Sequence, residues 1–403
     1  MMRIALFTYS TKPRGGVIHT LELAEALQKE GHDVCVYALD KDRIGFHRPV
    51  NCPHKLVPTK PAADRQLLLQ REQDYLDGKR NERHLDPVDE LIKQRIQEFI
   101  DYLLQEEERY DIYHSQDCIS SNALQVLRDK GLISHFIRTA HHIDEFNSPY
   151  LQACHDRSIL EPDLCLCVSQ YWQQQLREQY QIEAPVIING VDTQRFSRMS
   201  SQLSDQIAAL KQQLGINGSS VYLTIGGIEP RKNSVQLLQA FIEILKTHPQ
   251  AQLIIAGGET LFDYEPYRLE FFNLAQQHQL EIGKSLLLPG VVSEQDLPIM
   301  YHCADAFVFP SVKEGWGLVL LEAIASGLPI LTSNIPPFTE FLTSETALLV
   351  DPNSSRAIAN GMLEILNNNL AQRLINNSET IATRYSWQRS AQIHLDIYQE
   401  LVS

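Results

Sequence analysis

Short apolar runs alternate with segments of helical periodicity in the first forty residues. The run 4–7 is apolar throughout and leads through a polar loop to two glycines, Gly15 and Gly16. Over residues 17–30 apolar side chains recur every three or four positions, which predicts an amphipathic helix. The apolar run 34–39 predicts a second strand. The succession is therefore strand, helix, strand, and we expect a parallel sheet.

The same succession restarts in the second half of the chain. An apolar run at 221–225 ends in Gly226 and Gly227, and a helix is predicted over about 234–246. Two successive α/β units of this kind predict two Rossmann-like domains facing a cleft. Further strands of the second unit are predicted at 252–256, 286–288 and 306–309.

Three segments have less regular patterns. Residues 41–90 are polar, are broken by prolines and balance basic against acidic side chains. We expect a solvated insertion or a mobile lid there, rather than a basic membrane-binding patch. A helix is predicted over 88–108. The stretch 194–218, which is rich in Ser, Gln and Asn, is predicted to bridge the two halves.

Composition limits the class of protein. The chain has 403 residues, of which 43% are hydrophobic and 21% charged, as is typical of a globular protein with two or three domains. Its 35 Lys and Arg against 50 Asp and Glu give a net charge of −15. This acidic balance excludes a non-specific nucleic-acid binder, because phosphate contacts require an excess of cations. It does not exclude a small phosphorylated substrate, which meets only a local pocket.

The cysteines and the N-terminus bear on the compartment. The seven cysteines lack a paired spacing, which favours buried thiols in a reducing compartment over a disulfide framework. The N-terminus has no long apolar region of a secretory signal, and no stretch approaches the roughly 18 apolar residues of a membrane span. We therefore expect a cytoplasmic protein with at most peripheral membrane association.

The segment 309–326 combines a strand end, a glycine-rich loop and a helix. Glu314, Gly315 and Gly317 lie on the loop, and Glu322 lies eight positions after Glu314 in an apolar helical stretch. Backbone N–H groups at such a helix N-terminus attract anions. A carboxylate among apolar helix residues needs hydrogen-bond donors, and sugar hydroxyls would supply them. Standing alone, the segment is better explained by a salt-bridged helix glutamate and an ordinary loop glutamate.

Two adjacent cations, Arg231 and Lys232, follow the strand at 221–225. At a strand–helix turn they could hold a diphosphate and stabilise it as a leaving group. A lone surface Arg-Lys pair more often serves only solubility. The pattern Gly-x-Gly-x-x-Gly is absent from both strand–helix turns, which weakens the hypothesis of a nicotinamide-dependent dehydrogenase.

Jointly, these segments resemble glycosyltransferase family 4, the retaining nucleotide-sugar transferases of the glycosyl transferases group 1. The resemblance covers nearly the whole chain, and its motifs occur in family order. It implies an α/β protein of the GT-B fold, with an acceptor-binding domain at 1–195, a donor-binding domain at 196–385, and a helix at 386–403 that packs back on the first domain. The motifs are Gly15-Gly16, Thr139-Ala140-His141, Asn189-Gly190-Val191-Asp192, Glu229-Pro230-Arg231-Lys232, Leu288-Pro289-Gly290-Val291 and the Glu314…Glu322 pair.

The resemblance also implies roles for single residues. His141, Arg231, Lys232 and Glu314 would be catalytic, with the two cations on the diphosphate; His142 remains an alternative to His141. Residues on the glycine-rich loops and at helix starts would bind the donor, and Glu322 would bind its ribose hydroxyls. The implied donor-binding residues are Gly15, Gly16, Gly227, Val291, Gly315, Trp316, Gly317, Leu318, Val319 and Glu322.

The chain departs from the family at one position. Many members have Arg directly after the first glycine of the phosphate loop, where this chain has Gly227. Arg231 is then expected to supply part of the cationic contact with the diphosphate.

The implied reaction transfers a hexose, with retention, from a nucleoside diphosphate sugar to an acceptor hydroxyl. No His/Cys cluster suggests a metal, and we expect no metal and no other cofactor. A non-hydrolysing nucleotide-sugar epimerase, a non-catalytic nucleotide-sugar-binding protein and a phosphorylase of the same fold are the alternatives. The sequence leaves open the donor base and sugar, the oligomeric state, and whether the acceptor is a small molecule, a glycan or a lipid.

Overall fold

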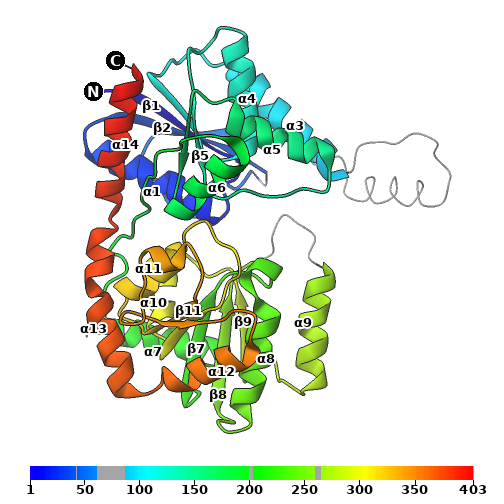
Figure 1. The fold of residues 1–403 in the computed structure, drawn as a ribbon, viewed down its shortest axis with the longest axis vertical. Coiled ribbons are helices and arrows are strands. Elements are labelled where there is room, and N and C mark those ends of the chain that lie inside the picture. Colours follow the sequence, from blue (N-terminus) through cyan, green and yellow to red (C-terminus); the bar gives the residue numbers. More distant parts are fainter. Residues whose placement is uncertain (42, 61–86, 199–202, 259–264, 403) are drawn as a thin grey trace, which may run out of the picture. The chain divides into compact units, whose positions relative to one another are not determined.

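Two compact α/β units make up the described chain. The first consists of Met1–Ile188 together with Trp387–Ser403, and the second of Asn189–Ser386. Each unit contains one sheet of six parallel strands with helices packed on it (Figure 1). The computed structural model describes residues 1–41, 43–60, 87–198, 203–258 and 265–402.

The first sheet has the strand order β3-β2-β1-β4-β5-β6. Its strands are β1 (Arg3–Thr8), β2 (Asp33–Asp40), β3 (His54–Pro58), β4 (Ile112–Ser115), β5 (Ile137–Ala140) and β6 (Leu164–Cys167). The helices are α1 (Gly15–Lys29), α3 (Pro87–Leu103), α4 (Cys118–Asp129), α5 (Pro149–Leu160), α6 (Gln170–Tyr180) and α14 (Trp387–Val402). The C-terminal helix α14 lies against α1 (Figure 1).

Alternation along the strands explains why both faces of this sheet are covered. Ala5 and Phe7 of β1 belong to a core cluster with α3 and α4, whereas Ile4 and Leu6 project from the opposite face and are equally buried. Parallel strands that are buried on both faces appear in the sequence as continuous apolar runs. This is the pattern from which the strands were predicted.

The second sheet repeats the arrangement, with the order β12-β11-β10-β7-β8-β9. Its strands are β7 (Ser220–Ile225), β8 (Ala251–Ala256), β9 (Leu286–Gly290), β10 (Ala306–Phe309), β11 (Ile330–Ser333) and β12 (Leu348–Val350). The helices are α7 (Ser204–Leu214), α8 (Ser234–Leu245), α9 (Glu265–Gln277), α10 (Leu297–Tyr301), α11 (Leu318–Ala325), α12 (Ser355–Glu364) and α13 (Asn368–Arg384).

Three sequence-based predictions need correction. The polar segment 41–90 contains a strand, β3, that pairs in parallel with β2, so the described part of this segment is not only an insertion; its remainder, 61–86, lies outside the described residues. The helix predicted over 88–108 ends at Leu103. The predicted bridge at 194–218 contains α7, which buries Ile207 and Leu210 within the second unit. At β3 and α7, packing within a unit decided the outcome, although the local polarity of the sequence had suggested irregular segments.

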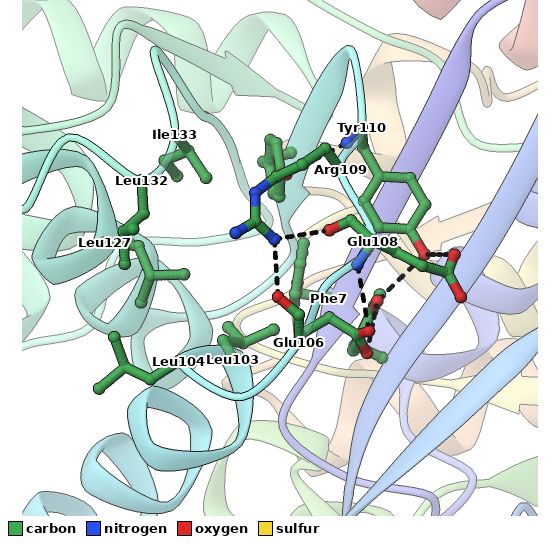
Figure 2. Close-up of a pocket in the computed structure, with 12 residues that line it drawn as sticks. Phe7, Leu103, Leu104, Glu106, Glu108, Arg109, Tyr110, Leu127, Leu132 and Ile133 are labelled. Atoms are coloured by element: carbon green, nitrogen blue, oxygen red, sulfur yellow. Dashed lines mark hydrogen bonds between the residues drawn. The ribbon is translucent and has the colours of Figure 1, made fainter.

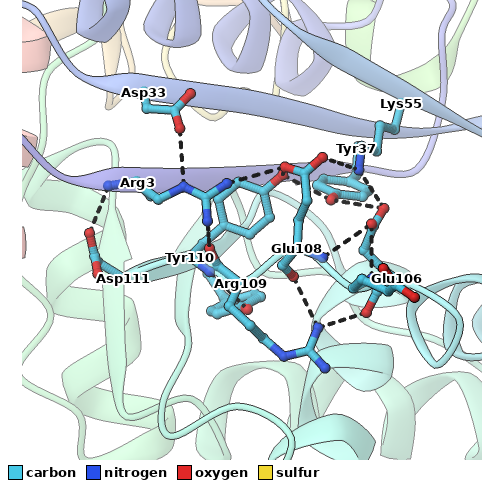
Figure 3. Close-up of polar contacts among 11 residues, drawn as sticks. Arg3, Asp33, Tyr37, Lys55, Glu106, Glu108, Arg109, Tyr110 and Asp111 are labelled. Atoms are coloured by element: carbon cyan, nitrogen blue, oxygen red, sulfur yellow. Dashed lines mark hydrogen bonds and ion pairs between the residues drawn. The ribbon is translucent and has the colours of Figure 1, made fainter.

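A network of ion pairs lies at the end of the first sheet where its strands begin (Figure 3). Nε of Arg3, at the start of β1, lies 3.1 Å from a carboxylate oxygen of Asp33, at the start of β2. The ammonium of Lys55 on β3 pairs with Glu106 and Glu108 at 2.7 and 2.8 Å. These contacts fasten the strand starts and the loop after α3 to one another.

A pocket lies beside this network (Figure 2). Leu103, Leu127 and Ile133 give it apolar walls, and Arg109, whose guanidinium donates to the carbonyl oxygen of Glu106 at 2.6 Å, gives it a polar one. None of the residues predicted to carry chemistry lines it. Ligands of parallel α/β sheets bind at the opposite edge, where the strands end.

The structure also bears on membrane insertion. Within the described residues, no helix combines the length and the apolar character needed to cross a membrane.

Candidate active site

The strand orders locate a candidate site in each unit. In the second sheet β7 is flanked by β10 on one side and β8 on the other, so the chain changes direction between β7 and β10. The first sheet changes direction in the same way between β1 and β4. In such sheets ligands bind beyond the carboxyl ends of the strands at this switch point. The predicted residues follow these strand ends in both units.

Arg231, Lys232 and Glu314 meet at the switch point of the second sheet. Nζ of Lys232 donates to Oε1 of Glu314 at 2.6 Å, and a terminal nitrogen of Arg231 donates to the same oxygen at 3.1 Å. The hydroxyl of Ser311 donates to it as well, at 2.8 Å. Nε of Arg231 pairs with the buried Glu229 at 3.0 Å. Arg231 and Lys232 thus share one carboxylate oxygen, that of Glu314, which lies 82 residues after Lys232 in the sequence.

The charges in this cluster shift one another's titration. Burial, followed by the guanidinium of Arg231, lowers the pKa of the Lys232 ammonium, and Glu314 opposes that shift. Burial by itself would raise the pKa of Glu314, but the charges of Lys232 and Arg231 outweigh it and the pKa is lowered. Glu314 is therefore a carboxylate at neutral pH and orients both cations.

Lys232 has donor capacity left for a ligand. Its ammonium lies 4.6 Å above the ring of Phe309, and in the described part of the chain Glu314 is its one hydrogen-bond acceptor. An ammonium has three N–H bonds, so two remain. The backbone at Gly226 has φ +151°, and a Cβ there would lie 3.1 Å from the Lys232 side chain. The absence of a side chain at position 226 therefore leaves room for the aliphatic part of Lys232 to extend toward Glu314.

Close backbone approaches explain the glycine at position 227. A Cβ on Gly227 would lie 2.5 Å from the carbonyl oxygen of Gly258, beyond the neighbouring strand β8. The larger side chain that many family members carry here would require this backbone to move. Val291, which follows β9, is 60% exposed and lies over Gly258. The doublet Gly257-Gly258 was not predicted as part of the site, although two glycines after an apolar run are a signal that the sequence contains.

The loop after β10 leads into a helix whose first turn has no side-chain cap. Gly317, at φ +107°, precedes α11, and no side chain caps its first turn. Leu318 and Val319 are the first two helical residues, so their N–H groups point out of the helix end and are available to an anion. Gly315 is half-buried on this loop. The indole of Trp316 is buried and stacks on Phe341 at 4.8 Å, so this side chain anchors the loop.

Glu322 lies inside α11 and is only 7% exposed. Its Oε2 accepts a hydrogen bond of 2.6 Å from the hydroxyl of Tyr301, on α10. Burial, then the charge of Glu322 and this hydrogen bond, raise the pKa of Tyr301 well above its usual range. The phenol is therefore the donor and the carboxylate the acceptor. Tyr301 is a residue of this site that the sequence did not indicate.

We expect Tyr301→Phe to lower the free energy of unfolding by about 1–3 kcal/mol, because the change leaves a buried carboxylate with one donor fewer. Tyr222→Phe is the matched control, since its hydroxyl is also buried but donates to a neutral carbonyl oxygen, that of Met362, at 2.9 Å. Urea denaturation of both variants measures the difference. A loss for Tyr301→Phe no larger than for the control would mean that Glu322 does not depend on this phenol.

In the first unit, Gly16 and His141 are adjacent. Gly15 and Gly16 are the first two residues of α1, and a Cβ on Gly16 would lie 3.6 Å from the imidazole of His141. Nε2 of His141 lies 3.0 Å from Oε1 of Gln116, which follows β4. Gly15 has open space where a Cβ would project. The structure thus brings together two predicted elements, the Gly-Gly start of α1 and the histidine after β5.

His141 and His142 have different surroundings. His142 is 45% exposed at its side chain and pairs with Asp144 at 2.9 Å. His141 contacts His19, with the ring centres 4.9 Å apart. Burial, followed by the charges that His19 and Arg138 can carry, lowers the pKa of His141 well below its usual range. His141 is therefore neutral at pH 7.

The sequence-based prediction of no metal overlooked one pattern: Asp40-Lys41-Asp42, which begins at the last residue of β2, is an Asp-x-Asp sequence of the kind found in metal-dependent sites. The carboxylate of Asp40 accepts hydrogen bonds from the backbone N–H groups of Ile44 and Gly45 at 3.2 and 3.1 Å, and Asp42 lies outside the described residues. Over the described ranges, no three His, Cys, Asp or Glu side chains gather as metal ligands.

Two family models match this chain. The model of Glycosyltransferase Family 4 matches residues 13–195, and that of Glycosyl transferases group 1 matches residues 206–380. A glycosyltransferase of Methanocaldococcus jannaschii, described as uncharacterized, is 25% identical over 99% of this chain and 98% of its own length.

Solved structures agree in fold. Sucrose-phosphate synthase from Thermosynechococcus elongatus superposes with a TM-score of 0.75 at 21% identity, covering 100% of this chain and 99% of that one. The Anabaena protein HepE in complex with UDP-glucose gives a TM-score of 0.74 at 17% identity, covering 99% and 100%. The two-unit α/β architecture and the solved structures agree on the GT-B fold. Because the family models also match both halves of the chain, the chain belongs to glycosyltransferase family 4 and is a glycosyltransferase of the GT-B fold.

Proposed function

We propose that this glycosyltransferase transfers a hexose, with retention of the anomeric configuration and without a metal, from a nucleoside diphosphate sugar to an acceptor hydroxyl. The observation that carries the proposal is the cluster of Lys232, Arg231 and Glu314 at the switch point of the second sheet. HepE, a structural neighbour, binds UDP-glucose, which supports this class of donor. The first unit, which contains His141, would receive the acceptor, whether that is a small molecule, a glycan or a lipid.

The departing diphosphate needs positive charge as its bond to the sugar breaks. Lys232 retains N–H bonds for it, and the N-terminus of α11 adds a partial positive charge through Leu318 and Val319. Because Glu314 already fixes Lys232, the cation does not have to reorganise when the diphosphate develops charge. Preorganisation of this kind lowers a barrier without requiring a metal ion.

The sugar itself passes through an oxocarbenium-like state, which hydrogen bonds to its hydroxyls can orient. Glu314 and the backbone at Gly315, Trp316 and Gly317 form the loop proposed to hold it. Glu322, oriented by Tyr301, is proposed to bind the ribose. The imidazole of His141 is neutral and so can accept a hydrogen bond from a substrate hydroxyl.

A thermal-shift panel of UDP-, GDP- and ADP-sugars tests the donor class. A donor that binds the native state raises the melting temperature by mass action, by an amount that corresponds to about 2.7 kcal/mol at a hundred times its dissociation constant. We expect a shift from one base, and a smaller shift for the same donor in a Glu322→Ala variant. Absence of a shift from every donor would contradict the proposal.

The donor found in this way then allows the reaction to be tested. Release of nucleoside diphosphate only when an acceptor is present separates transfer from epimerisation. The anomeric proton coupling of the product reports retention, and unchanged turnover in EDTA reports independence from metal. An inverted product or loss of turnover in EDTA would each reject the corresponding part of the proposal.

A further inference from the structure

A chain of buried polar side chains connects the C-terminal helix to His141. The hydroxyl of Tyr398, on α14, lies 2.6 Å from Nδ1 of His114, at the carboxyl end of β4. Nε2 of His114 lies 3.2 Å from the amide nitrogen of Gln116, and the amide oxygen of Gln116 lies 3.0 Å from Nε2 of His141. Tyr398 and His114 are 0% exposed and Gln116 is 3% exposed, so water does not compete for these contacts. All four residues belong to the first unit.

The orientation of the Gln116 amide, with its nitrogen toward His114 and its oxygen toward His141, gives a direction to the hydrogen bonds of this chain. An amide nitrogen only donates and an amide oxygen only accepts. Nε2 of His114 must therefore be the unprotonated nitrogen, and its Nδ1–H donates to Tyr398. The hydroxyl of Thr139, 2.7 Å from the same Nε2, is then also a donor, and it shares the single lone pair of this nitrogen with the longer contact from Gln116. At the other end, Nε2 of His141 must carry the proton that Gln116 accepts.

We propose that Gln116 is a positioning residue which, anchored through His114 to Tyr398, holds His141 as the tautomer protonated at Nε2 and leaves its Nδ1 as a hydrogen-bond acceptor for substrate. Within the described residues Nδ1 of His141 has no hydrogen-bond partner, and the ring is partly exposed. The part of the proposal that concerns substrate rests on the function proposed above. The tautomer itself does not.

The groups around His141 also favour a neutral ring. Burial lowers the pKa of His141 most, and the charges that His19 on α1, Arg138 on β5, the adjacent His142 and His114 on β4 can carry lower it further. No carboxylate is among these main causes. A neutral imidazole can be fixed as one tautomer, whereas an imidazolium has two N–H donors and no acceptor.

The tautomer can be measured directly in the full-length protein labelled with ¹⁵N-histidine. Long-range proton–nitrogen spectra distinguish protonated from unprotonated ring nitrogens, and a His141→Gln variant identifies the signals of His141. We expect the wild type to show a protonated Nε2 and an unprotonated Nδ1. A His141 protonated at Nδ1 in the wild type would overturn the proposal.

Variants test whether Gln116 and Tyr398 cause this state. In Gln116→Leu, we expect His141 to become a mixture of tautomers and kcat to fall at least about tenfold with little change in KM. Tyr398→Phe removes a hydroxyl only and should move the signals of His114 and, more weakly, those of His141. Tyr180→Phe is its control, because that hydroxyl bonds Asp156 outside the chain of contacts.

A third variant provides a readout that a purely structural role would not move. Gln116→Glu keeps an acceptor opposite Nε2–H but adds a negative charge, which raises the pKa of His141. We expect the acidic limb of the kcat profile to move to higher pH, whereas in Gln174→Glu, at an exposed position on α6, it should stay in place.

The results separate this proposal from the proposed function. A single unchanged tautomer in Gln116→Leu overturns the positioning role. A changed tautomer together with normal turnover in His141→Ala supports the positioning role and rejects the catalytic role of His141.

Discussion

Lys232→Ala is expected to reduce turnover by about 10²–10³-fold while the protein stays folded. The variant removes the ammonium that is proposed to bind the departing diphosphate, and the loss of one preorganised donor typically has an effect of this size. It also leaves Glu314 with Arg231 as its cation, so the pKa of Glu314 rises. Steady-state kinetics with the donor identified by thermal shift measures the loss, and a melting curve checks the fold.

Two further substitutions show whether charge or packing is responsible. Lys232→Met keeps most of the stem that crosses Gly226 but has no charge, and should be as inactive as the alanine variant. Lys246→Ala is the matched control, because the Lys246 side chain is 62% exposed and pairs with Glu243, one helical turn before it, at 2.7 Å. Near-normal turnover in Lys232→Met would contradict the proposed electrostatic role.

Acid is expected to destabilise the first unit steeply below about pH 6. Buried histidines have a lowered pKa there, mainly because of burial: well below the usual range for His114 and His141, about 4 for His155 and about 3 for His394. These rings stay neutral in the native state but bind protons near pH 6.5 in the unfolded chain. Their contribution is therefore fully present above pH 6.5 and is lost as the pH falls toward the native values.

The size of this effect follows from proton linkage. Each such histidine changes the free energy of unfolding by about 1.4 kcal/mol per pH unit once the unfolded chain is protonated, so the four together give about 5.6 kcal/mol per unit near pH 5. A domain stable by 5–15 kcal/mol cannot sustain this over many units. We expect urea midpoints of the first unit to fall sharply between pH 6 and pH 4.5.

Tryptophan fluorescence can follow the first unit alone. Of the three tryptophans, Trp172 and Trp387 lie in the first unit and Trp316 in the second, so a Trp316→Phe variant reports on the first. His394→Gln removes one of the four titrating rings and should reduce the pH slope by about a quarter. An unfolding free energy that is constant from pH 6.5 to pH 5 would refute the argument.

The local pattern of apolar and polar residues was sufficient to predict many of the strands. The runs 4–7 and 34–39 became β1 and β2, and the run 306–309 became β10, because strands buried on both faces must be continuously apolar. The strand β3 was missed because it lies at the edge of the sheet and is half-exposed, so its pattern is not that of a buried strand. Helix α3 was extended too far, since a helix end depends on what packs beyond it.

The sequence indicated which types of side chain the candidate site contains, but not all of the contacts between them. The glutamates and cations could be identified because glycine-rich loops and charged pairs at strand–helix turns carry a local signal. Tyr301 could not, since a tyrosine in a short helix is indistinguishable from a core residue until Glu322 lies 2.6 Å away. The same holds for Gln116 and His114, whose roles depend on partners on other elements.

The sequence by itself therefore determined the α/β class, the repeated strand–Gly-Gly–helix unit and the kinds of side chain available for chemistry, because each is encoded at periods of two to four residues or in short motifs. Only the tertiary structure decided that Lys232 and Arg231 share Glu314, that Tyr301 holds Glu322, and that Tyr398 reaches His114 across 284 residues. Parallel sheets bring the ends of strands together at a switch point whatever their separation in the chain, and no local period of the sequence records that proximity.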